Sequence, residues 1–226
     1  MKNILKIFGK IAVFTLLLLV TVVGCENDST INKGEDIILI CLGDSLTAGF
    51  GATRPFLVDK SNSYPAYLQK KVNFSVINAG VSGDTTAQGL ARVDSDVLSK
   101  DPDIVIILLG ANDVFSDIPI STTQNNLQNI INKVDSGNRK IYLAKFYTDA
   151  TAAAMSIPSD TITQYNNMFT TLAASSNKIT LIEDIWTGVW GIHMSDNIHP
   201  NARGYEIMAD NIFNAIKPCL QTINNL

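Results

Sequence analysis

Three side chains of this sequence have the types and the spacing required for nucleophilic catalysis. Ser45 offers a hydroxyl, which becomes a good nucleophile only when a base takes its proton. His199 is a suitable base because imidazole titrates near neutral pH, and Asp196 stands three residues before it. One turn of chain brings residues at that spacing to the same side, so Asp196 could hold one ring nitrogen while the other faces Ser45. The pattern predicts acyl transfer through a Ser-His-Asp triad.

The same positions also have purely structural interpretations. Serine is a favoured helix N-cap, so Ser45 could simply begin a helix. Asp196 and His199 could form a capping turn ahead of Pro200. The one other histidine, His193, has no carboxylate three residues before it, and we interpret it as an ordinary loop or packing residue. Because nucleophile, base and carboxylate are all present, catalysis is the stronger hypothesis.

Acyl transfer also needs hydrogen-bond donors aimed at the negative charge that develops on the carbonyl oxygen. The candidates are the backbone N–H groups of Ser45 and Gly83 and the side-chain amide of Asn112. Asparagine after Gly110 could instead serve the turn, since asparagine is well tolerated there. Its position at the end of a predicted strand favours a functional role.

Apolar runs of strand length precede Ser45, Gly83 and Asn112. Five such runs alternate with stretches whose apolar residues recur at helical spacing. This alternation predicts right-handed crossovers and a parallel sheet covered by helices on both faces. The predicted strands are residues 37–42, 74–79, 104–109, 140–146 and 179–182, and the predicted helices are residues 64–72, 87–98, 122–134, 161–174 and 201–217.

The expected fold is α/β, a three-layer αβα sandwich with a flavodoxin-like, five-stranded parallel sheet in the order 2-1-3-4-5. In that order the first strand lies between the second and the third, and the loops after these three strands converge. Ser45, Gly83 and Asn112 then become neighbours. Asp44 and Asp113, which follow the first and third strands, are expected to brace their turns through hydrogen bonds to nearby backbone.

The first 35 residues are expected to lie outside this domain. Three lysines precede an apolar run too short to span a bilayer comfortably, a pattern typical of a secretory signal peptide over residues 1–24. The run ends in Val-Val-Gly-Cys, which resembles a bacterial lipobox whose cysteine, Cys25, is lipidated. Residues 25–35 then form the lipidated cysteine and a polar tether. The sequence predicts an exported, membrane-anchored lipoprotein of the cell envelope, with a single uncleaved anchor helix as the alternative.

Composition limits the class of protein. The chain has 226 residues and a formal net charge of −4, which suits one domain, residues 36–226. It contains no basic patch or arginine-rich run, which argues against nucleic acid as a partner. Its three cysteines, Cys25, Cys41 and Cys219, lack the spacing of a metal site, and we expect Cys41 and Cys219 to be structural thiols rather than a disulfide.

Four blocks of sequence, in order along the chain, resemble the GDSL, or SGNH, hydrolase family. They are residues 43–49 (GDSLTAG), 78–85 (NAGVSGDT), 110–113 (GAND) and 196–201 (DNIHPN), and the likeness extends from about residue 36 to residue 217. The likeness is closest to the bacterial multifunctional thioesterase, lysophospholipase and arylesterase branch, partly because of QGLAR at residues 88–92. The resemblance implies a flavodoxin-like sandwich with no metal or cofactor, a triad of Ser45, Asp196 and His199, and an oxyanion hole of Ser45, Gly83 and Asn112.

Two features depart from the family pattern. Asn197 stands where a glycine is common, which could shift the last loop slightly. The loop over residues 50–63 is longer than in the compact thioesterases. The preference of those enzymes for particular acyl chains therefore does not carry over.

The resemblance implies a serine hydrolase that cleaves carboxylic esters through an acyl-enzyme, as an acyl esterase or lysophospholipase. Acyl-CoA is a cytosolic metabolite, so a surface lipoprotein is expected to act on small-molecule or lipid esters instead. The alternatives are a short-chain glycan O-deacetylase that uses the same site and a non-catalytic, lipid-anchored binding protein. Ten apolar side chains in nearby loops could line an acyl pocket or pack locally: Phe50, Phe56, Leu57, Val114, Phe115, Ile118, Trp186, Val189, Trp190 and Met194.

Overall fold

The computed structural model describes residues 37–137, 139–146 and 155–224. The predicted signal segment, the lipobox cysteine Cys25 and the polar tether lie outside these ranges. Within them, no helix has both the length and the apolar character needed to cross a membrane.

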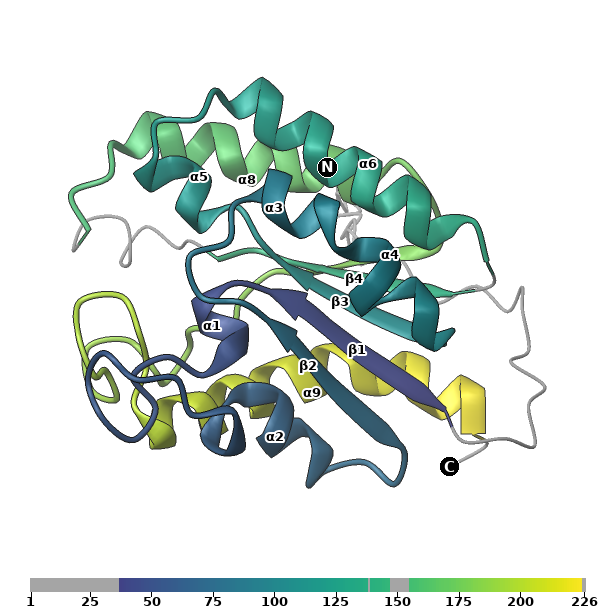
Figure 1. Cartoon of the computed structure of the whole chain (residues 1–226), viewed down its shortest axis with the longest axis horizontal. Coiled ribbons are helices and arrows are strands. Elements are labelled where there is room, and N and C mark those ends of the chain that lie inside the picture. Colours follow the sequence, from purple (N-terminus) through teal and green to yellow (C-terminus); the bar gives the residue numbers. More distant parts are fainter. Residues whose placement is uncertain (1–36, 138, 147–154, 225–226) are drawn as a thin grey trace, which may run out of the picture.

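A five-stranded parallel sheet forms the centre of the domain, with the strand order β2-β1-β3-β4-β5 (Figure 1). This order confirms the predicted topology, and the predicted strands agree with the observed ones to within two residues. The strands are β1 Ile38–Gly43, β2 Ser75–Gly80, β3 Ile104–Leu108, β4 Lys140–Ala144 and β5 Ile179–Ile182.

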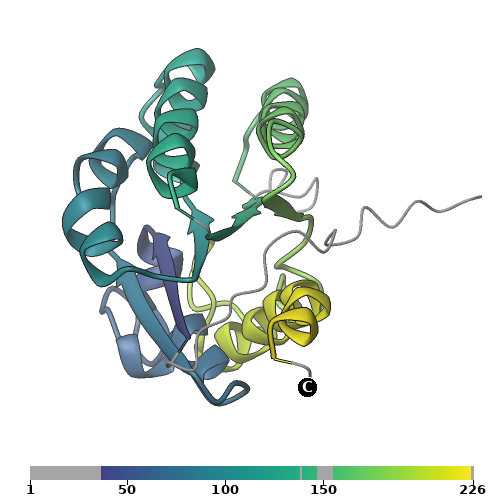
Figure 2. The same cartoon turned by 90° about the vertical axis from the view of Figure 1, so that its right-hand side faces the viewer.

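Helices cover both faces of the sheet and complete the three-layer sandwich (Figure 2). On one face lie α2 Tyr64–Gln69 and α9 Ala202–Asn224; on the other lie α3 Thr86–Ala91, α4 Val93–Asp96, α6 Ile120–Asp135 and α8 Ser159–Ala173. Two short helices, α1 Ser45–Ala48 and α5 Ala111–Phe115, follow β1 and β3, and the short 3-10 helices are η1 Lys60–Asn62 and η2 Leu98–Lys100.

The core lies where the sheet meets these helices. Every residue of β3 is buried, because this strand has sheet neighbours on both sides and helices on both faces. Helix α6 buries one apolar stripe against the sheet, formed by Leu127, Ile130, Ile131 and Val134. Cys41 in β1 is a buried free thiol, and burial raises its pKa to about 12, so it stays protonated. The side chain of Cys219 lies outside the described part.

Some local predictions differ from the structure. The single helix predicted over residues 87–98 breaks at Arg92, whose backbone (φ −111°, ψ 5°) leaves the helical region. The N-cap of α1 is Asp44, whose carboxylate accepts the N–H of Leu46, and Ser45 is the first helical residue rather than the cap. Helix α9 runs through Pro218 to residue 224 instead of ending at residue 217.

Candidate active site

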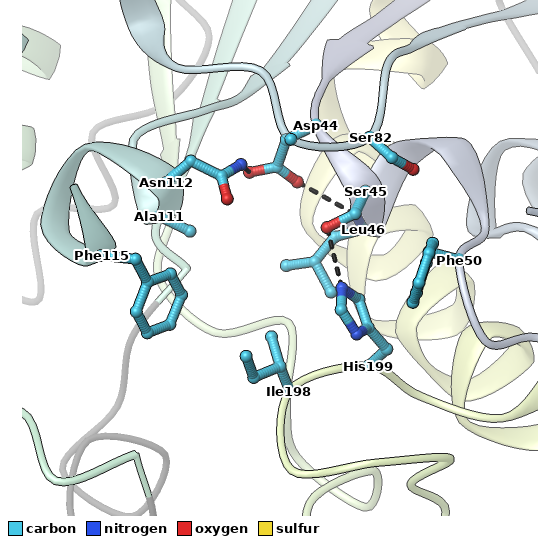
Figure 3. A pocket seen from close by; sticks show the side chains of 11 residues that line it. Asp44, Ser45, Leu46, Phe50, Ser82, Ala111, Asn112, Phe115, Ile198 and His199 are labelled. Carbon is cyan, nitrogen blue, oxygen red and sulfur yellow. Dashed lines mark hydrogen bonds between the residues drawn. The ribbon is translucent and has the colours of Figure 1, made fainter. Parts of the chain in front are cut away.

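The structure brings Ser45, His199 and Asp196 together at the carboxyl edge of the sheet. Figure 3 shows the contact between Ser45 and His199. Ser45 Oγ lies 2.9 Å from His199 Nε2, although the two residues are 154 positions apart in the chain. His199 Nδ1 lies 2.9 Å from Asp196 Oδ2 and 3.1 Å from Asp196 Oδ1. A hydroxyl, an imidazole and a carboxylate are thus in hydrogen-bonding series, as proton transfer from the hydroxyl requires.

The loop before α9 holds the imidazole in this position. Asp196 Oδ1 accepts the backbone N–H of Ile198 at 2.8 Å and that of His199 at 2.7 Å. Partial burial acts to raise the pKa of Asp196, but its hydrogen bonds from the backbone and ring of His199 and from Ile198 outweigh burial and lower the pKa. The ring of Phe50 packs at a centroid distance of 4.5 Å on the ring of His199. Asp196 is therefore ionised at neutral pH and fixes the orientation of its neighbour.

A pocket of about 220 Å³ opens over Ser45 and His199. Its walls are mainly apolar, and its polar members include the turn at Gly83 and the side chain of Asn112. Figure 3 shows Phe50, Phe115 and Ile198 around the space in front of the Ser45 hydroxyl. The apolar lining residues are Leu46, Phe50, Ala111, Phe115 and Ile198.

The three predicted oxyanion donors all line this pocket. The N–H of Ser45 belongs to the first turn of α1, where N–H groups have no acceptor within the helix. Gly83 has φ +87°, a backbone conformation that residues with a side chain rarely adopt. The space beside it is open, because a Cβ added there would meet no atom within 4 Å. The amide of Asn112 donates to the carbonyl of Asp84 at 2.9 Å and makes a longer contact of 3.5 Å with Asp44 Oδ2.

Asp44 is a buried carboxyl directly beside the nucleophile. Desolvation is the main cause that raises its pKa to about 7, and the negative charges of Asp84 and Asp113 add to the effect. It caps α1 through the N–H of Leu46 at 3.0 Å, which agrees with the expected bracing role.

The sequence suggested that Asp113 braces its own turn. In the structure its carboxylate instead braces the start of a helix, α3, 27 residues earlier in the chain. Its carboxylate accepts the backbone N–H of Thr86 at 2.8 Å, together with the hydroxyl of Thr86, and the hydroxyl of Thr123 at 3.1 Å. Asp113 thereby joins the starts of α3 and α6 to α5, the short helix that carries Asn112. This contact depends on tertiary structure, so local sequence could not reveal it.

Arg92 is a site residue to which the sequence analysis gave no role. Its guanidinium donates to the carbonyl of Gly43 at 2.9 Å and to that of Ala79 at 2.7 Å. Gly43 is the last residue of β1, and Ala79 is the next-to-last residue of β2. It also pairs with Asp84 Oδ2 at 2.6 Å and with Asp96 Oδ2 at 3.0 Å. One side chain therefore connects the strand end before Ser45 to the turn that carries Gly83. The only sequence signal was its place in the QGLAR block at residues 88–92.

The ten apolar loop residues divide into three groups. Phe50 and Phe115 line the pocket over Ser45, and Phe115 also borders a second pocket of about 490 Å³ with Val114 and Ile118. Trp186 and Val189 pack in the core, where the indole N–H of Trp186 donates to the carbonyl of Phe146 at 2.8 Å, and Trp190 and Met194 pack against that core. Phe56 and Leu57 are exposed. His193 is absent from the pocket walls, and its carbonyl accepts the N–H of Asn201 at 2.9 Å.

Comparison with known proteins gives consistent matches. Residues 41–207 match the GDSL-like Lipase/Acylhydrolase family. The chain is 28% identical over 193 residues to Esterase TesA of Pseudomonas aeruginosa, covering 80% of this chain and 89% of that protein. It is 28% identical over 189 residues to Thioesterase 1/protease 1/lysophospholipase L1 of Escherichia coli strain K12, covering 80% and 83% of the two chains. The crystal structure of TesA superposes with a TM-score of 0.69 at 28% identity, covering 80% of this chain and 98% of that one.

Replacement of Arg92 tests its positioning role. We expect Arg92→Gln to lower kcat for ester hydrolysis about tenfold or more with KM changed less than about threefold, because the turn carrying Gly83 loses its connection to Gly43. Asp84 is left without its cation, so the free energy of unfolding should fall by roughly 3 kcal/mol. Arg203→Gln, which removes an exposed pair with Glu206, is the matched control and should change neither quantity appreciably. An unchanged kcat in Arg92→Gln would contradict the positioning role.

Ionisation of Asp44 predicts a pH-dependent stability. The folded pKa of about 7 lies above the ordinary 3.8, so the folded chain keeps a proton that the unfolded chain has released between those pH values. The contribution of this carboxyl to stability is therefore present below about pH 4 and is lost as the pH rises to 7, by up to roughly 4 kcal/mol. Asp44→Asn cannot ionise, so urea unfolding from pH 4 to 8 should show the variant gaining stability relative to the wild type. A constant difference across that range would refute the prediction.

Proposed function

The chain belongs to the GDSL-like lipase/acylhydrolase family, and from that premise we propose that it hydrolyses carboxylic esters of acyl groups in the pocket over Ser45. Family membership makes it a hydrolase. The observation that carries the assignment of residues is the 2.9 Å contact between Ser45 Oγ and His199 Nε2, with Asp196 on the opposite ring nitrogen.

In the first half of the reaction, Ser45 Oγ attacks the ester carbonyl carbon while His199 Nε2 accepts the hydroxyl proton. The carbonyl electron pair moves to the oxygen and forms a tetrahedral oxyanion. Asp196, ionised at neutral pH, stabilises the imidazolium that results. Collapse of the intermediate breaks the bond to the alcohol, which leaves with the proton from His199, and the acyl group remains on Ser45.

Donors on three segments, which follow β1, β2 and β3, would hold the oxyanion. Ser45, Gly83 and Asn112 all line the pocket, and the donors would be the N–H groups of the first two and the side-chain amide of the third. One amide proton of Asn112 is committed to the carbonyl of Asp84 at 2.9 Å. The same nitrogen lies 3.5 Å from Asp44 Oδ2, too long for a strong hydrogen bond, so the oxyanion can compete for its second proton. Such donors typically contribute about 10²–10³ each in rate.

In the second half, water attacks the acyl-enzyme with His199 again as the base. The same donors receive the second oxyanion. Its collapse breaks the bond between the acyl carbon and Ser45 Oγ, which takes back the proton from His199. The products are a carboxylic acid and the free enzyme.

Acyl esters of amphiphilic alcohols are the substrates we propose. The pocket walls are mainly aliphatic and aromatic, which suits an acyl chain better than a sugar. The name of the Escherichia coli relative includes both thioesterase and lysophospholipase activities. We further propose that Cys25 carries a lipid that anchors the enzyme in the cell envelope. The sequence has lysines first, then an apolar run, then the lipobox, which is the order found in a lipoprotein signal.

Paired variants test the triad. We expect Ser45→Ala and His199→Ala each to reduce kcat/KM by at least about 10³-fold, because the attack then lacks its nucleophile or its base. Rates are measured with p-nitrophenyl esters from acetyl to decanoyl. His193→Ala and Ser99→Ala are the matched controls and should stay within about twofold, since neither side chain lines the pocket.

Three outcomes would count against this proposal. Retention of most activity by Ser45→Ala would disprove the assignment of the nucleophile. A fluorophosphonate that never labels Ser45 in the folded wild type would instead favour a non-catalytic binding protein. A sharp preference for the acetyl ester would favour glycan O-deacetylation over acyl esters of amphiphiles.

Metabolic labelling tests the anchor. In bacterial cells given radiolabelled palmitate, the wild-type protein should become labelled and Cys25→Ala should not, because the thiol of Cys25 is the proposed attachment point. A known lipoprotein in the same cells controls for uptake of the label. An unlabelled wild-type protein beside a labelled control would rule the anchor out.

A further inference from the structure

The exposed large apolar side chains of the described chain lie at the edge of the sheet where the pocket opens. They lie on loops that follow β1, β2, β3 and β5, and in a parallel sheet these loops all emerge at the carboxyl edge, on the left in Figure 1. None of the exposed large apolar side chains among residues 37–137, 139–146 and 155–224 lies at the opposite edge. We call this set the apolar rim: Phe56, Leu57, Val58, Val81, Phe115 and Ile192.

A hairpin after α1 contributes half of the rim. Phe50 and Val58 form an antiparallel bridge, and the N–H of Gly51 donates to the carbonyl of Leu57 at 2.8 Å. At the tip, Phe56 is 78% exposed and has φ +65°, an unusual backbone conformation for a bulky residue. The hairpin therefore holds a large aromatic side chain in solvent at its tip.

The base of this hairpin is fixed to the catalytic loop. The hydroxyl of Tyr205 donates to the carbonyl of Phe50 at 2.8 Å, and the ring of Phe50 packs on His199. The far side of the hairpin is braced by Asp59, which accepts hydrogen bonds from Thr53 at 2.9 Å and Asn62 at 3.0 Å. The tip is thus held in a defined position beside the pocket, as a preformed contact surface requires.

We propose that the apolar rim docks on the surface of an aggregated amphiphile, a bilayer or a micelle, so that the pocket opens directly against the lipid–water interface. The proposal deepens the proposed function and rests on it for the identity of the substrate. The rim residues lie on four segments at the edge of the sheet where the pocket opens, and Phe115 lines the pocket itself. A protein bound over this edge would close the pocket, whereas a lipid surface would supply substrate to it. Exposed Arg54 and Lys60 flank the hairpin tip and suit the anionic headgroups of such a surface.

Fluorescence quenching tests the docking without using catalysis. The full chain carrying Phe56→Trp is reconstituted in vesicles of phosphatidylcholine and phosphatidylglycerol with brominated acyl chains. Because the chain already carries Trp186 and Trp190, the signal of position 56 is the fluorescence of the variant minus that of the wild type under the same conditions. We expect this signal to be quenched by roughly half, since rim residues would enter the headgroup and acyl boundary. Asn73→Trp is the matched control, because position 73 is exposed between α2 and β2 at the other edge of the sheet, and its indole should not be quenched. All variants share residues 1–36, so attachment through Cys25 is common to them.

Kinetics provide the second measurement. Phe56→Ser combined with Leu57→Ser should hydrolyse soluble p-nitrophenyl acetate within about twofold of the wild type but lose at least about tenfold on a monoacyl phospholipid mixed into the vesicles. Phe56→Leu, which keeps the tip apolar, should retain both rates.

Two results would overturn the docking proposal. One is quenching at position 56 no greater than at position 73, and the other is an equal loss on both substrates by the double serine variant. A wild type that hydrolyses neither substrate while the indole at position 56 is quenched would refute the proposed function and leave the docking supported.

Discussion

The pairing of β1 between β2 and β3 is the constraint on which the rest of the structure depends. In this register Gly43 lies beside Gly80 on one side and Leu108 on the other, so the three strands end at the same level. The turns that carry Ser45, Gly83 and Asn112 must therefore emerge together. A Cβ at Gly80 would lie 2.3 Å from the backbone nitrogen of Ala48, which shows how closely α1 packs on the strand ends.

Buried charge holds these turns at their mutual distances. Asp44, Asp84 and Asp113 all lie in the interior near the nucleophile, and Arg92 is the cation that pairs with Asp84. Such a cluster is costly unless every member is hydrogen-bonded. Here Asp44 and Asp113 bond to helix N-termini, and Arg92, the partner of Asp84, bonds to the ends of two strands. The polar network therefore connects the elements that apolar packing has already brought together.

Much of the fold could be predicted from the sequence because its signals are local. The apolar runs predicted the five strands, and their alternation with helical patterns predicted the parallel sheet. The apolar stripe on α6 is buried as expected. The predicted site residues Ser45, His199 and Asp196 lie within hydrogen-bonding distance in series, while their chemical roles stay a proposal.

What the sequence missed depends on contacts between distant elements. Arg92 lies between α3 and α4 yet bonds to the ends of two strands, and Asp113 braces Thr86, 27 positions away. From the sequence, Trp186 could equally have lined the pocket or packed in the core; the structure buries it in the core, where its indole N–H donates to the distant carbonyl of Phe146. The segment before residue 37 lies outside the described part, so signal peptide and lipid attachment stay predictions.

If the chain is anchored through Cys25, the edge of the sheet at which the chain enters the domain sets how the pocket is oriented relative to the membrane. Ile37 leads into β1 at the amino edge of the sheet, and the pocket opens at the carboxyl edge. With the tether extended perpendicular to the membrane, the pocket would therefore face away from that membrane. Twelve residues, 25–36, can span about 40 Å when fully extended, roughly twice the length of β1. A tether of that length would let the domain reorient so that the pocket contacts the membrane to which the chain is anchored.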